Sequence, residues 1–519
     1  MKSIIPLALA IVLTGCATGP RYVRPTVDVP VSYKRGGSLP PAPAPGWQAA
    51  VPRDAQQRGA WWEIFHEREL NSLEERVDVS NQTVRQAVAT LEQARALAGQ
   101  ARALYFPTIG AGAGVTPGHT SANVSSSLAG RTVTEYSAGL TASWEPDLFD
   151  KIGHQVTAAT ARAQASAGDL AAVELSMHAQ LAADYFDLRQ VDAQTALLDQ
   201  TVHAYDQALT MVRERYDMGV ASEYELAQAE AQLQAARAQL IDLGVSRARL
   251  EDSIAALIGV PASEFSLPPD PTELAPPEIP VGVPSELLER RPDVAAAERR
   301  VAASNADVGS AVSAFFPDLM LSATGGFDAY GIGNLLTLPS RFWAVGPQII
   351  GTLFDGGLRH QRVVQAKAGY QASVAAYRQV VLTSFQEVED NMAALRVLAS
   401  EAQAQQAAVA DSQHALDLAM TLYRGGATDY LNVVTAQTTA LANERQATAI
   451  AGRRLDASVL LVKSLGGLWS GGSELGSVSS VATPVREALS PDCPTVRCRH
   501  RRSRCADPSD CAPGRLRGK

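Results

Sequence analysis

Hydrophobic positions along the chain follow two different periods. Three short stretches alternate apolar residues with small or polar ones, which predicts strands with one apolar face. Two much longer stretches, 154–214 and 358–423, are rich in alanine and glutamine and predict helices. The alternating apolar positions are Ile109, Ala111, Ala113 and Val115, then Tyr136, Ala138, Leu140, Ala142 and Trp144, and later Leu319, Leu321 and Ala323.

Three short sequences recur in the same order at a nearly constant distance. Phe106-Pro107 returns as Phe316-Pro317, and Leu148-Phe149-Asp150 returns as Leu353-Phe354-Asp355. The glycine-containing stretch 215–222 returns as 422–429. Because one match would be noise and three keep their order, the pattern predicts a duplicated unit of about 200 residues.

Each unit has the same predicted order of elements. A first helix precedes a strand, a Ser/Gly-rich loop, a return strand, a very long helix, a glycine-containing turn and a last helix. At about 1.5 Å per residue the helix over 154–214 is about 90 Å long, which favours long antiparallel hairpins over a soluble four-helix bundle. The other ranges are 73–104 and 285–313 for the first helices, 118–131 and 328–340 for the loops, and 222–258 and 430–465 for the last helices.

Strands with one apolar and one small or polar face are typical of a membrane β-barrel, with lipid outside and water inside. A soluble β-hairpin on a helical protein is the alternative. Four strands per chain cannot close a barrel, because the smallest barrels have about eight. A membrane barrel therefore requires several subunits.

Composition excludes some classes of protein. The chain has 519 residues, of which 46% are hydrophobic and only 6% aromatic, and its apolar content is largely alanine. A mean hydropathy of −0.04 argues against a polytopic helical membrane protein. The net charge of −9 argues against a nucleic-acid partner.

The first 16 residues resemble a bacterial lipoprotein signal. Lys2 precedes an apolar stretch, 4–12, that is too short to span a bilayer. Leu13-Thr14-Gly15-Cys16 then resembles a lipobox, which implies removal of residues 1–15 and lipidation of Cys16. An ordinary signal peptide with a chance cysteine is the alternative. Ala17, in place of an aspartate retention signal, favours the outer membrane.

Residues 16–469 resemble the TolC-like outer membrane efflux proteins, in particular the OprM-like (NodT-type) lipoprotein branch. The most specific marker is ERRPDVAAAER at 289–299. The other markers are WWEIF at 61–65, Ala94-Arg95-Ala96, Phe106-Pro107, SWEPDLF at 143–149, Ala314-Phe315-Phe316-Pro317, LFDGG at 353–357 and LGGLW at 465–469.

The resemblance implies a fold that is mainly α with a small transmembrane β part. Three chains form a homotrimeric α-barrel tunnel and a shared twelve-strand β-barrel. The implied partners are outer membrane lipids, a periplasmic adaptor (membrane fusion) protein and an inner-membrane RND-type pump. The implied role is a gated passive duct for drugs and toxic small molecules. Type I protein secretion and a non-pore periplasmic coiled-coil scaffold are the alternatives, and the strand alternation at 136–144 argues against the scaffold.

The two glycine-containing turns are the candidate adaptor-contact and gate region. Their glycines suit the left-handed geometry of a helix reversal, and Ser222 and Asp429 suit the N-cap position. By resemblance, Tyr423 is a gate-link tyrosine and Leu431 forms a constriction ring. Thr435 stands where the family has aspartate, so no acidic ring is expected there. The turn residues are Gly219, Val220, Ala221, Ser222, Gly425, Gly426, Ala427, Thr428 and Asp429.

No motif points to an enzyme, a cofactor or a resident metal. The eight histidines have no ligand spacing, and the glycines at 110–114 do not open a helix. The tail 470–519 departs from the family and favours disorder, although a pair of disulfides or a zinc site is an alternative. Its four cysteines are Cys493, Cys498, Cys505 and Cys511.

The chain is therefore expected to divide into six segments. These are the signal peptide 1–15, an extended N-terminal segment 16–72, a first repeat 73–260 with a hairpin at 107–145, a Pro-rich linker 261–284, a second repeat 285–469 with a hairpin at 317–354, and the tail 470–519.

Overall fold

The computed structural model describes residues 19–30, 33–34, 59–272, 274–277, 279 and 290–467. The predicted signal segment, Cys16 and the tail 470–519 lie outside the described residues, and their roles stay predictions.

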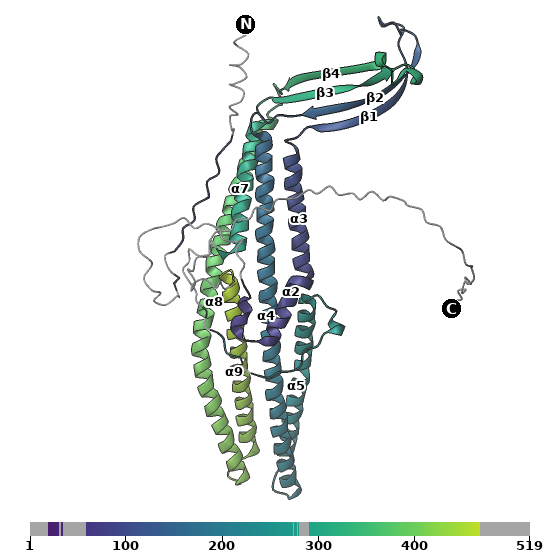
Figure 1. Ribbon diagram of the computed structural model, residues 1–519. Helices are drawn as coiled ribbons and strands as arrows, with labels where there is room; N and C mark the ends of the chain where they lie inside the picture. Colours follow the sequence, from purple (N-terminus) through teal and green to yellow (C-terminus); the bar gives the residue numbers. More distant parts are fainter. Residues whose placement is uncertain are drawn as a thin grey trace, which may run out of the picture. The chain divides into compact units, whose positions relative to one another are not determined.

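Two series of elements follow one another along the chain (Figure 1). The first contains η1 (Trp61–Phe65), α2 (Arg68–Ser80), α3 (Gln82–Ala103), β1 (Thr108–His119), β2 (Thr132–Trp144), α4 (Lys151–Asp217) and α5 (Glu223–Leu257). The second contains α7 (Pro292–Ser313), β3 (Asp318–Ala329), β4 (Arg341–Ile350), α8 (Leu358–Arg424) and α9 (Tyr430–Ser464). The short 3-10 turns η2 (Ala262–Glu264), η3 (Ile332–Asn334) and η4 (Leu338–Ser340) lie in connections.

The two series match element by element. The helices α3 and α7 have 22 residues each, and the strands β1 and β3 have 12 each. The helices α4 and α8 have 67 residues each, and α5 and α9 have 35 each. The predicted duplication of a long helical hairpin and a β-hairpin is confirmed, whereas the limits of the six segments stay predictions.

The predicted single helix over 73–104 is wrong, because the chain breaks at Asn81. Asn81 has extended backbone, and its side-chain oxygen accepts hydrogen bonds from the amides of Thr83 and Val84 at 2.8 and 3.0 Å. Its side-chain nitrogen donates to the carbonyl of Leu257 at 2.8 Å. A side chain that caps α3 and also binds the end of α5 therefore separates α2 from α3. The second predicted helix, 285–313, is represented by α7, which begins at Pro292.

The four strands form one antiparallel sheet in the order β1-β2-β3-β4. Ile109 lies opposite Ala142, and Ala142 lies opposite Ala323, which in turn lies opposite Val345. These four residues therefore share one face, and Met320, Phe342 and Ile350 lie on the other. The opposite face carries small and polar residues, which include Gly112, Gly139, Thr141, Thr324 and Asp328. Among the described residues, no helix combines the length and hydropathy needed to cross a membrane.

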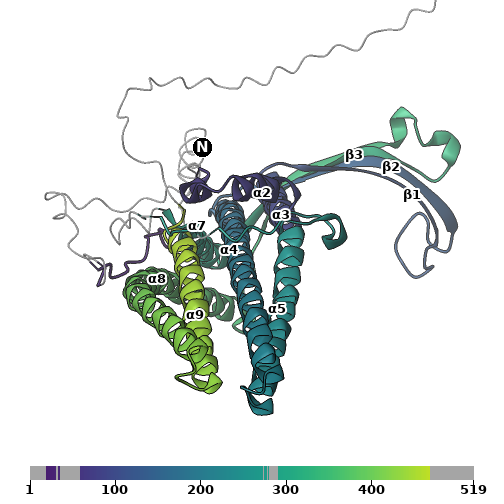
Figure 2. The same ribbon diagram turned by 90° about the horizontal axis from the view of Figure 1, so that it is seen from below.

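Each long helix pairs with the shorter helix that follows it. Both views show α4 beside α5 and α8 beside α9 (Figures 1 and 2). Helix α4 also packs against α3, α7 and α9, so it joins the two repeats. Alanine and glycine line this joint: a Cβ added to Gly168 would lie 3.0 Å from the Cβ of Ala296 of α7. Small residues therefore allow the close approach that the alanine-rich sequence predicts.

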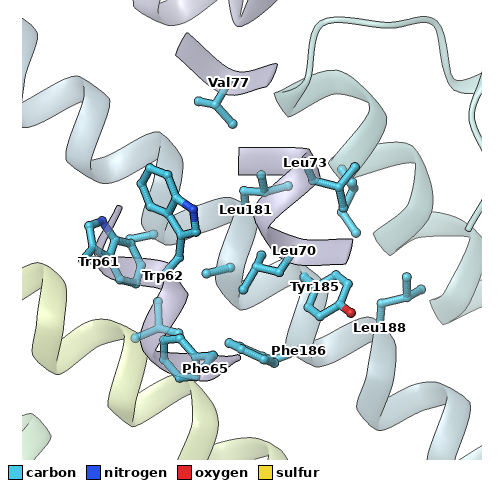
Figure 3. Packing of buried hydrophobic residues seen from close by; sticks show 14 of the residues in the cluster. Trp61, Trp62, Phe65, Leu70, Leu73, Val77, Leu181, Tyr185, Phe186 and Leu188 are labelled. Atoms are coloured by element: carbon cyan, nitrogen blue, oxygen red, sulfur yellow. The ribbon is translucent and has the colours of Figure 1, made fainter. Parts of the chain in front are cut away.

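The largest apolar core lies where η1 and α2 pack against the middle of α4 (Figure 3). The rings of Phe65 and Phe186 are 4.8 Å apart, and Trp61 and Trp62 meet edge to face at 5.8 Å. Leu70 and Leu181 are fully buried in the same cluster. The N-terminal motif WWEIF is thus a docking segment, and its three aromatic side chains are all buried in this cluster.

A buried imidazole also fastens α2 to α4. His178 of α4 lies between two carboxylates of α2, with Nδ1 2.7 Å from Glu74 and Nε2 2.9 Å from Asp78. The ring of Trp62 stacks on the imidazole at 4.5 Å. Burial raises the pKa of Glu74 to about 7, against the opposing effect of His178. Burial alone lowers the pKa of His178, but Glu74 and Asp78 outweigh it and raise that pKa.

The ERRPDVAAAER motif forms a brace at the start of α7. Pro292 occupies the first turn, where its missing N–H costs nothing. The guanidinium of Arg291 pairs with Asp293 at 2.7 Å and with Glu387 of α8 at 2.5 Å. It also donates to the carbonyl of Ser464 at the end of α9 at 3.1 Å. The predicted local pairing of Arg291 with Asp293 is therefore present, and the same arginine ties together three helices of the second repeat.

Candidate gate at the two helix turns

The first turn reverses the chain between α4 and α5. Gly219 adopts a left-handed φ of 73°, and the amide of Val220 donates to the carbonyl of Arg215 at 2.8 Å. Ser222 then caps α5 in a capping box: its hydroxyl accepts from the amide of Glu225, and the carboxylate of Glu225 accepts from the amide of Ser222. The predicted roles of Gly219 and Ser222 are both present.

The second turn, between α8 and α9, repeats the backbone geometry of the first but lacks its side-chain cap. Gly426 adopts the left-handed φ of 71°, whereas Gly425 stays right-handed at −76°, so only the second glycine has the predicted geometry. The amide of Ala427 donates to the carbonyl of Leu422 at 2.9 Å, 207 positions after the matching bond. Asp429 occupies the N-cap position of α9, but its side chain accepts no capping hydrogen bond. The predicted capping role of Asp429 is wrong.

In place of that cap, the next polar residues bond to each other. The side chain of Asn432 donates to the hydroxyl of Thr428 at 2.6 Å. Thr428, before the helix, and Asn432, in its first turn, thus form a hydrogen bond with each other. The carboxylate of Asp429 forms no capping hydrogen bond with α9. The carboxylate at the second turn is therefore available to a group from outside the turn.

A cluster of aromatic and aliphatic residues joins the two turns. Tyr423, only 1% exposed, packs against Tyr430 with ring centroids 5.2 Å apart. The guanidinium of Arg215 from the first turn lies 4.6 Å from the centroid of the Tyr423 ring and donates to the Tyr423 carbonyl at 2.8 Å. Burial raises the pKa of Tyr430 to about 12, so these rings are neutral at physiological pH. The other buried members are Tyr205, Leu209, Val212, Ala229, Leu233, Ala236 and Val433.

The hydroxyl of Tyr423 is buried and has no hydrogen-bond partner within the described part of the chain. Burial also raises its pKa, and the nearby carboxylate of Glu225 adds to that rise. A buried hydroxyl without a partner is costly and is uncommon in folded proteins. The hydroxyl is therefore a candidate for a bond to a group that the single chain does not supply.

The two predicted constriction residues lie on one exposed stripe of α9. Leu431 is 52% exposed, and Thr435 follows one turn later. The hydroxyl of Thr435 donates to the carbonyl of Leu431 at 2.9 Å, and Thr439 donates to Thr435 in the same way. Because these hydroxyl protons are used within the helix, the stripe presents methyl groups and hydroxyl oxygens. It carries no ionised side chain from Leu431 to Asn443.

Two acidic residues near the first turn, Glu225 and Glu230, have local partners. Glu225 belongs to the capping box, and the carboxylate of Glu230 pairs with Arg213 at 2.8 Å. These contacts agree with a solvated helix face rather than with a charge that compensates for Thr435. Within the described residues, no group of three or more histidine, cysteine, aspartate or glutamate side chains could hold a metal ion.

Sequence reasoning missed Arg215 and Tyr430 as parts of this cluster. The only sequence signal near this cluster was the repeat. It makes Tyr216 the counterpart of Tyr423, and both tyrosines lie one helical turn before the left-handed glycine. Tyr216 is 39% exposed, however, while Tyr423 is buried. The two repeats use the same residue in different environments, which the repeat pattern cannot reveal.

Comparison with known proteins places these features in a family. The family model described as "Outer membrane efflux protein" matches residues 75–260 and 283–467. The probable efflux pump outer membrane protein TtgC of Pseudomonas putida is 30% identical over 492 residues, which cover 93% of this chain and 99% of TtgC. The cation efflux system protein CusC of Escherichia coli is 28% identical over 472 residues, which cover 90% of this chain and 98% of CusC.

The fold also agrees with solved structures. The outer-membrane channel OprN superposes with a TM-score of 0.78 at 29% sequence identity. The superposition covers 87% of this chain and 99% of the OprN chain. The mainly helical fold with a small sheet is thus shared with a channel along almost its whole length.

Proposed function

The chain belongs to the outer membrane efflux protein family, and on that basis we propose that it is the outer membrane channel of a tripartite efflux pump. Members of this family are channels, so the expectation that the chain is not an enzyme is confirmed. The proposed channel conducts small molecules passively from the periplasm to the exterior. A homotrimer forms it, anchored by lipid on Cys16, and an adaptor protein and an inner-membrane RND-type pump dock at its periplasmic end.

The register of the sheet is the observation that carries this proposal. Ile109, Ala142, Ala323 and Val345 form one apolar row across all four strands, and mostly small or polar residues occupy the other face. A sheet wetted on one side and covered by lipid on the other has this pattern. Three such sheets make the proposed twelve-strand barrel. A non-pore scaffold has no need of an apolar face on an exposed sheet.

The proposed gate comprises the two turns and the residues that follow the second one. The turns 219–222 and 425–429 are the adaptor-contact region, and Tyr423 links the closed tips of neighbouring chains. Its unpartnered buried hydroxyl supports this role, because a neighbouring chain can supply the acceptor. Leu431 forms a ring of three side chains that narrows the duct. Thr435 keeps the next level neutral, so the closed gate does not prefer cations.

Planar-bilayer recordings of the purified protein test the channel. We expect discrete conductance steps and a trimeric mass in detergent, and the absence of steps together with a monomeric mass would contradict the proposal. A gene for an RND-type pump beside this one would favour efflux over the alternative, a type I protein secretion duct. The lipobox also favours efflux.

Tyr423→Phe tests the gate separately. The substitution keeps the ring contacts with Arg215 and Tyr430 and removes only the hydroxyl. We expect a higher conductance of the closed state in the same bilayers. A closed-state conductance equal to that of the wild type would exclude a latch made by this hydroxyl.

Thr435→Asp tests the neutral constriction. Three carboxylates close to one axis would favour cations and bind multivalent ones. We expect the variant to acquire cation preference and block by a trivalent cation, which the wild type lacks. Thr438→Asp is the matched control, because the Thr438 hydroxyl accepts from Gln232 of α5 at 3.2 Å and so lies beside that helix. Strong cation block of the wild type would refute the neutral gate.

A further inference from the structure

The loops that join the strands of the two hairpins differ in their exposed residues. The serine-rich loop 120–131, between β1 and β2, has Val124 as its only exposed large hydrophobic residue. The apolar loop 330–340, between β3 and β4, exposes four such residues. They are Tyr330, Ile332, Leu336 and Leu338, each at least 60% exposed. The duplicated plan of the chain does not account for this difference, so the apolar loop meets a requirement that the serine-rich loop does not.

The apolar loop is folded, with its polar groups turned inward. The hydroxyl groups of Thr337 and Ser340 both donate to the carbonyl of Asn334, at 2.7 and 2.8 Å, and both residues are half-buried. The short turn η4 packs against β3, which keeps Leu338 close to the sheet. A loop adapted to water shows the reverse arrangement, because exposed hydrophobic patches mark surfaces that contact another molecule or a membrane.

An unpaired charge follows the apolar loop directly. Arg341 is the first residue of β4, and on the face of the four described strands that carries Ile109 and Val345 it is the only arginine, lysine, aspartate or glutamate. Its side chain is exposed and forms no hydrogen bond or ion pair with the described part of the chain. Phe327 lies opposite Arg341, and Trp343, which is 77% exposed, lies two positions along on the same face. The guanidinium therefore lies among aromatic residues without an anion from its own chain.

The acidic residues at this end of the sheet lie on the other face. Asp328 lies opposite Ser137, and Glu135 lies two positions before Ser137, so both carboxylates point away from the face of Arg341. In the proposed barrel their face lines the water-filled lumen. The sheet thus separates its charges, with the base on the lipid side and the acids on the water side.

The register sets the depth of Arg341 in the proposed barrel. Ile349 and Arg341 share a face of β4 and are eight residues apart, which is about 27 Å along the strand. At a tilt of about 35–45° this is about 20 Å along the barrel axis, and the apolar band of such barrels is about 25 Å tall. Each hairpin begins and ends beside helices, so its loop lies at the far end of the sheet (Figure 1). Because those helices are periplasmic in the proposed channel, Arg341 lies at the boundary of the exterior leaflet. An arginine on the lipid face costs far less there than at the midplane.

The groups gathered at this boundary match one chemical class of lipid. A guanidinium binds phosphate through two parallel N–H···O bonds. Tryptophan at a membrane boundary lies at the level of the headgroups. Exposed leucines beside a basic residue are typical of segments that rest between headgroups and acyl chains. The exterior leaflet of an outer membrane is built from a phosphorylated glycolipid, which presents phosphates and acyl chains at this depth.

We propose that Arg341, Trp343 and the apolar loop 330–340 bind a phosphorylated glycolipid of the exterior leaflet. The guanidinium of Arg341 holds a phosphate of this lipid, and the ring of Trp343 packs beside it. Leu336 and Leu338 contact the adjoining acyl segments. The inference rests on the proposed outer membrane channel and gives it a lipid partner that the serine-rich loop of the first repeat does not bind.

Titration with lipid A tests the phosphate contact. Diphosphoryl lipid A is added to the purified full-length trimer in detergent, and native mass spectrometry counts the bound lipid. We expect Arg341→Gln to weaken binding by about tenfold or more, through loss of hydrogen bonds to a charged group. Arg341→Lys should weaken it less, because lysine keeps the charge but not the two parallel bonds. Fully dephosphorylated lipid A should bind wild type and Arg341→Gln equally. Equal affinity of these two proteins for diphosphoryl lipid A would refute the contact.

Arg131→Gln is the matched control for this titration. Arg131 precedes β2 at the same end of the sheet, is exposed and belongs to the serine-rich loop. We expect unchanged binding of lipid A, so a loss equal to that of Arg341→Gln would indicate attraction by net charge alone and would overturn the specific site. Wild-type affinity for phosphatidylglycerol equal to that for lipid A would overturn the glycolipid as the partner. A wild type without a trimeric mass or conductance steps would contradict the proposed channel and not this site alone.

A nitroxide label locates the apolar loop independently of lipid affinity. The label is attached to Leu338→Cys or, as the matched control, to Ser125→Cys of the serine-rich loop. Both chains have their tail cysteines replaced by serine, at Cys493, Cys498, Cys505 and Cys511. In bilayers that contain lipid A, we expect the label at position 338 to collide more often with oxygen, which dissolves in lipid, and the label at position 125 with a water-soluble nickel chelate. Equal access of the chelate to both labels would refute lipid contact by the apolar loop. Dipolar broadening between labels at position 338 would also overturn it, because the loops of neighbouring copies would then contact one another.

Discussion

Replacing Glu74 by glutamine removes a charge from the bridge that fastens α2 to α4 while keeping the shape of the side chain. Glu74 is fully buried, and one of its oxygens has no partner among the described residues. Its pKa rises from the ordinary 4.5 to about 7 through burial. A shift of one pKa unit corresponds to about 1.4 kcal/mol. The folded state therefore binds the Glu74 proton about 3 kcal/mol more tightly than the unfolded state does.

The sign of the pH dependence is the same for both titrating groups. Glu74 has a raised folded pKa, so its contribution to stability is present below about pH 4.5 and is lost as the pH rises to about 7. His178 also has a raised pKa, so its contribution is present below pH 6.5 and is lost as the pH rises through the folded value. The attachment of α2 to α4 is therefore expected to weaken from about pH 5 to pH 8.

Hydrogen exchange of the peptide 68–80 measures this attachment locally. Wild type and Glu74→Gln are compared at the same pH, which cancels the intrinsic exchange rate. At about pH 5.5 we expect similar protection, because the wild-type carboxyl is mostly protonated. At about pH 8 we expect the glutamine variant to be more protected by up to about 100-fold, the equivalent of about 3 kcal/mol.

Asp78→Asn is the control for this comparison. Asp78 contacts the other nitrogen of His178, but its side chain is 59% exposed. An exposed ion pair is worth about 0–1 kcal/mol, so we expect at most about a fivefold change in the protection ratio between the two pH values. A protection ratio of Glu74→Gln to wild type that is the same at both pH values would refute the assignment of raised proton affinity to this bridge.

Three further substitutions test local features, each by the thermal midpoint of the detergent-solubilised protein. Gly426→Ala should cost about 1–2 kcal/mol, because Gly426 has a left-handed φ, whereas Gly425→Ala should be nearly neutral. Ser222→Ala should cost about 1 kcal/mol through loss of the capping box, and Asp429→Ala should cost far less; equal costs would contradict the difference between the two caps. Arg291→Ala should cost about 1–3 kcal/mol, since it removes charge-assisted hydrogen bonds to two partly exposed carboxylates, and a cost below about 0.5 kcal/mol would contradict the brace.

Local patterns predicted the long helices and their turns well. The expected helix over 154–214 is α4, Lys151–Asp217, and the expected 430–465 is α9, Tyr430–Ser464. Continuous helical composition and glycine at the reversal are signals between near neighbours in sequence, so they survive without knowledge of the fold. The same holds for the strand faces, because side-chain alternation sets the face of each residue before any partner strand is known.

Local sequence patterns did not predict features that depend on contacts between distant residues. Asn81 ends α2 because its side chain also reaches Leu257, 176 positions away. The left-handed geometry falls on Gly426 and not on Gly425, although both glycines permit it. At Asn81 the sequence allows a continuous helix, and a partner far along the chain selects the break.

The sequence by itself determined the duplicated plan of this protein: the long helices, the turn positions, the strand faces and the family to which it belongs. Only the tertiary structure decided which copy of each repeated feature is used. Tyr423 is buried under Arg215 while Tyr216 is exposed, and Phe149 is stacked while Phe354 is bare. The physical reason is that a linear repeat gives both units the same local preferences, whereas burial depends on neighbours, and one chain supplies neighbours on one side of each repeat only.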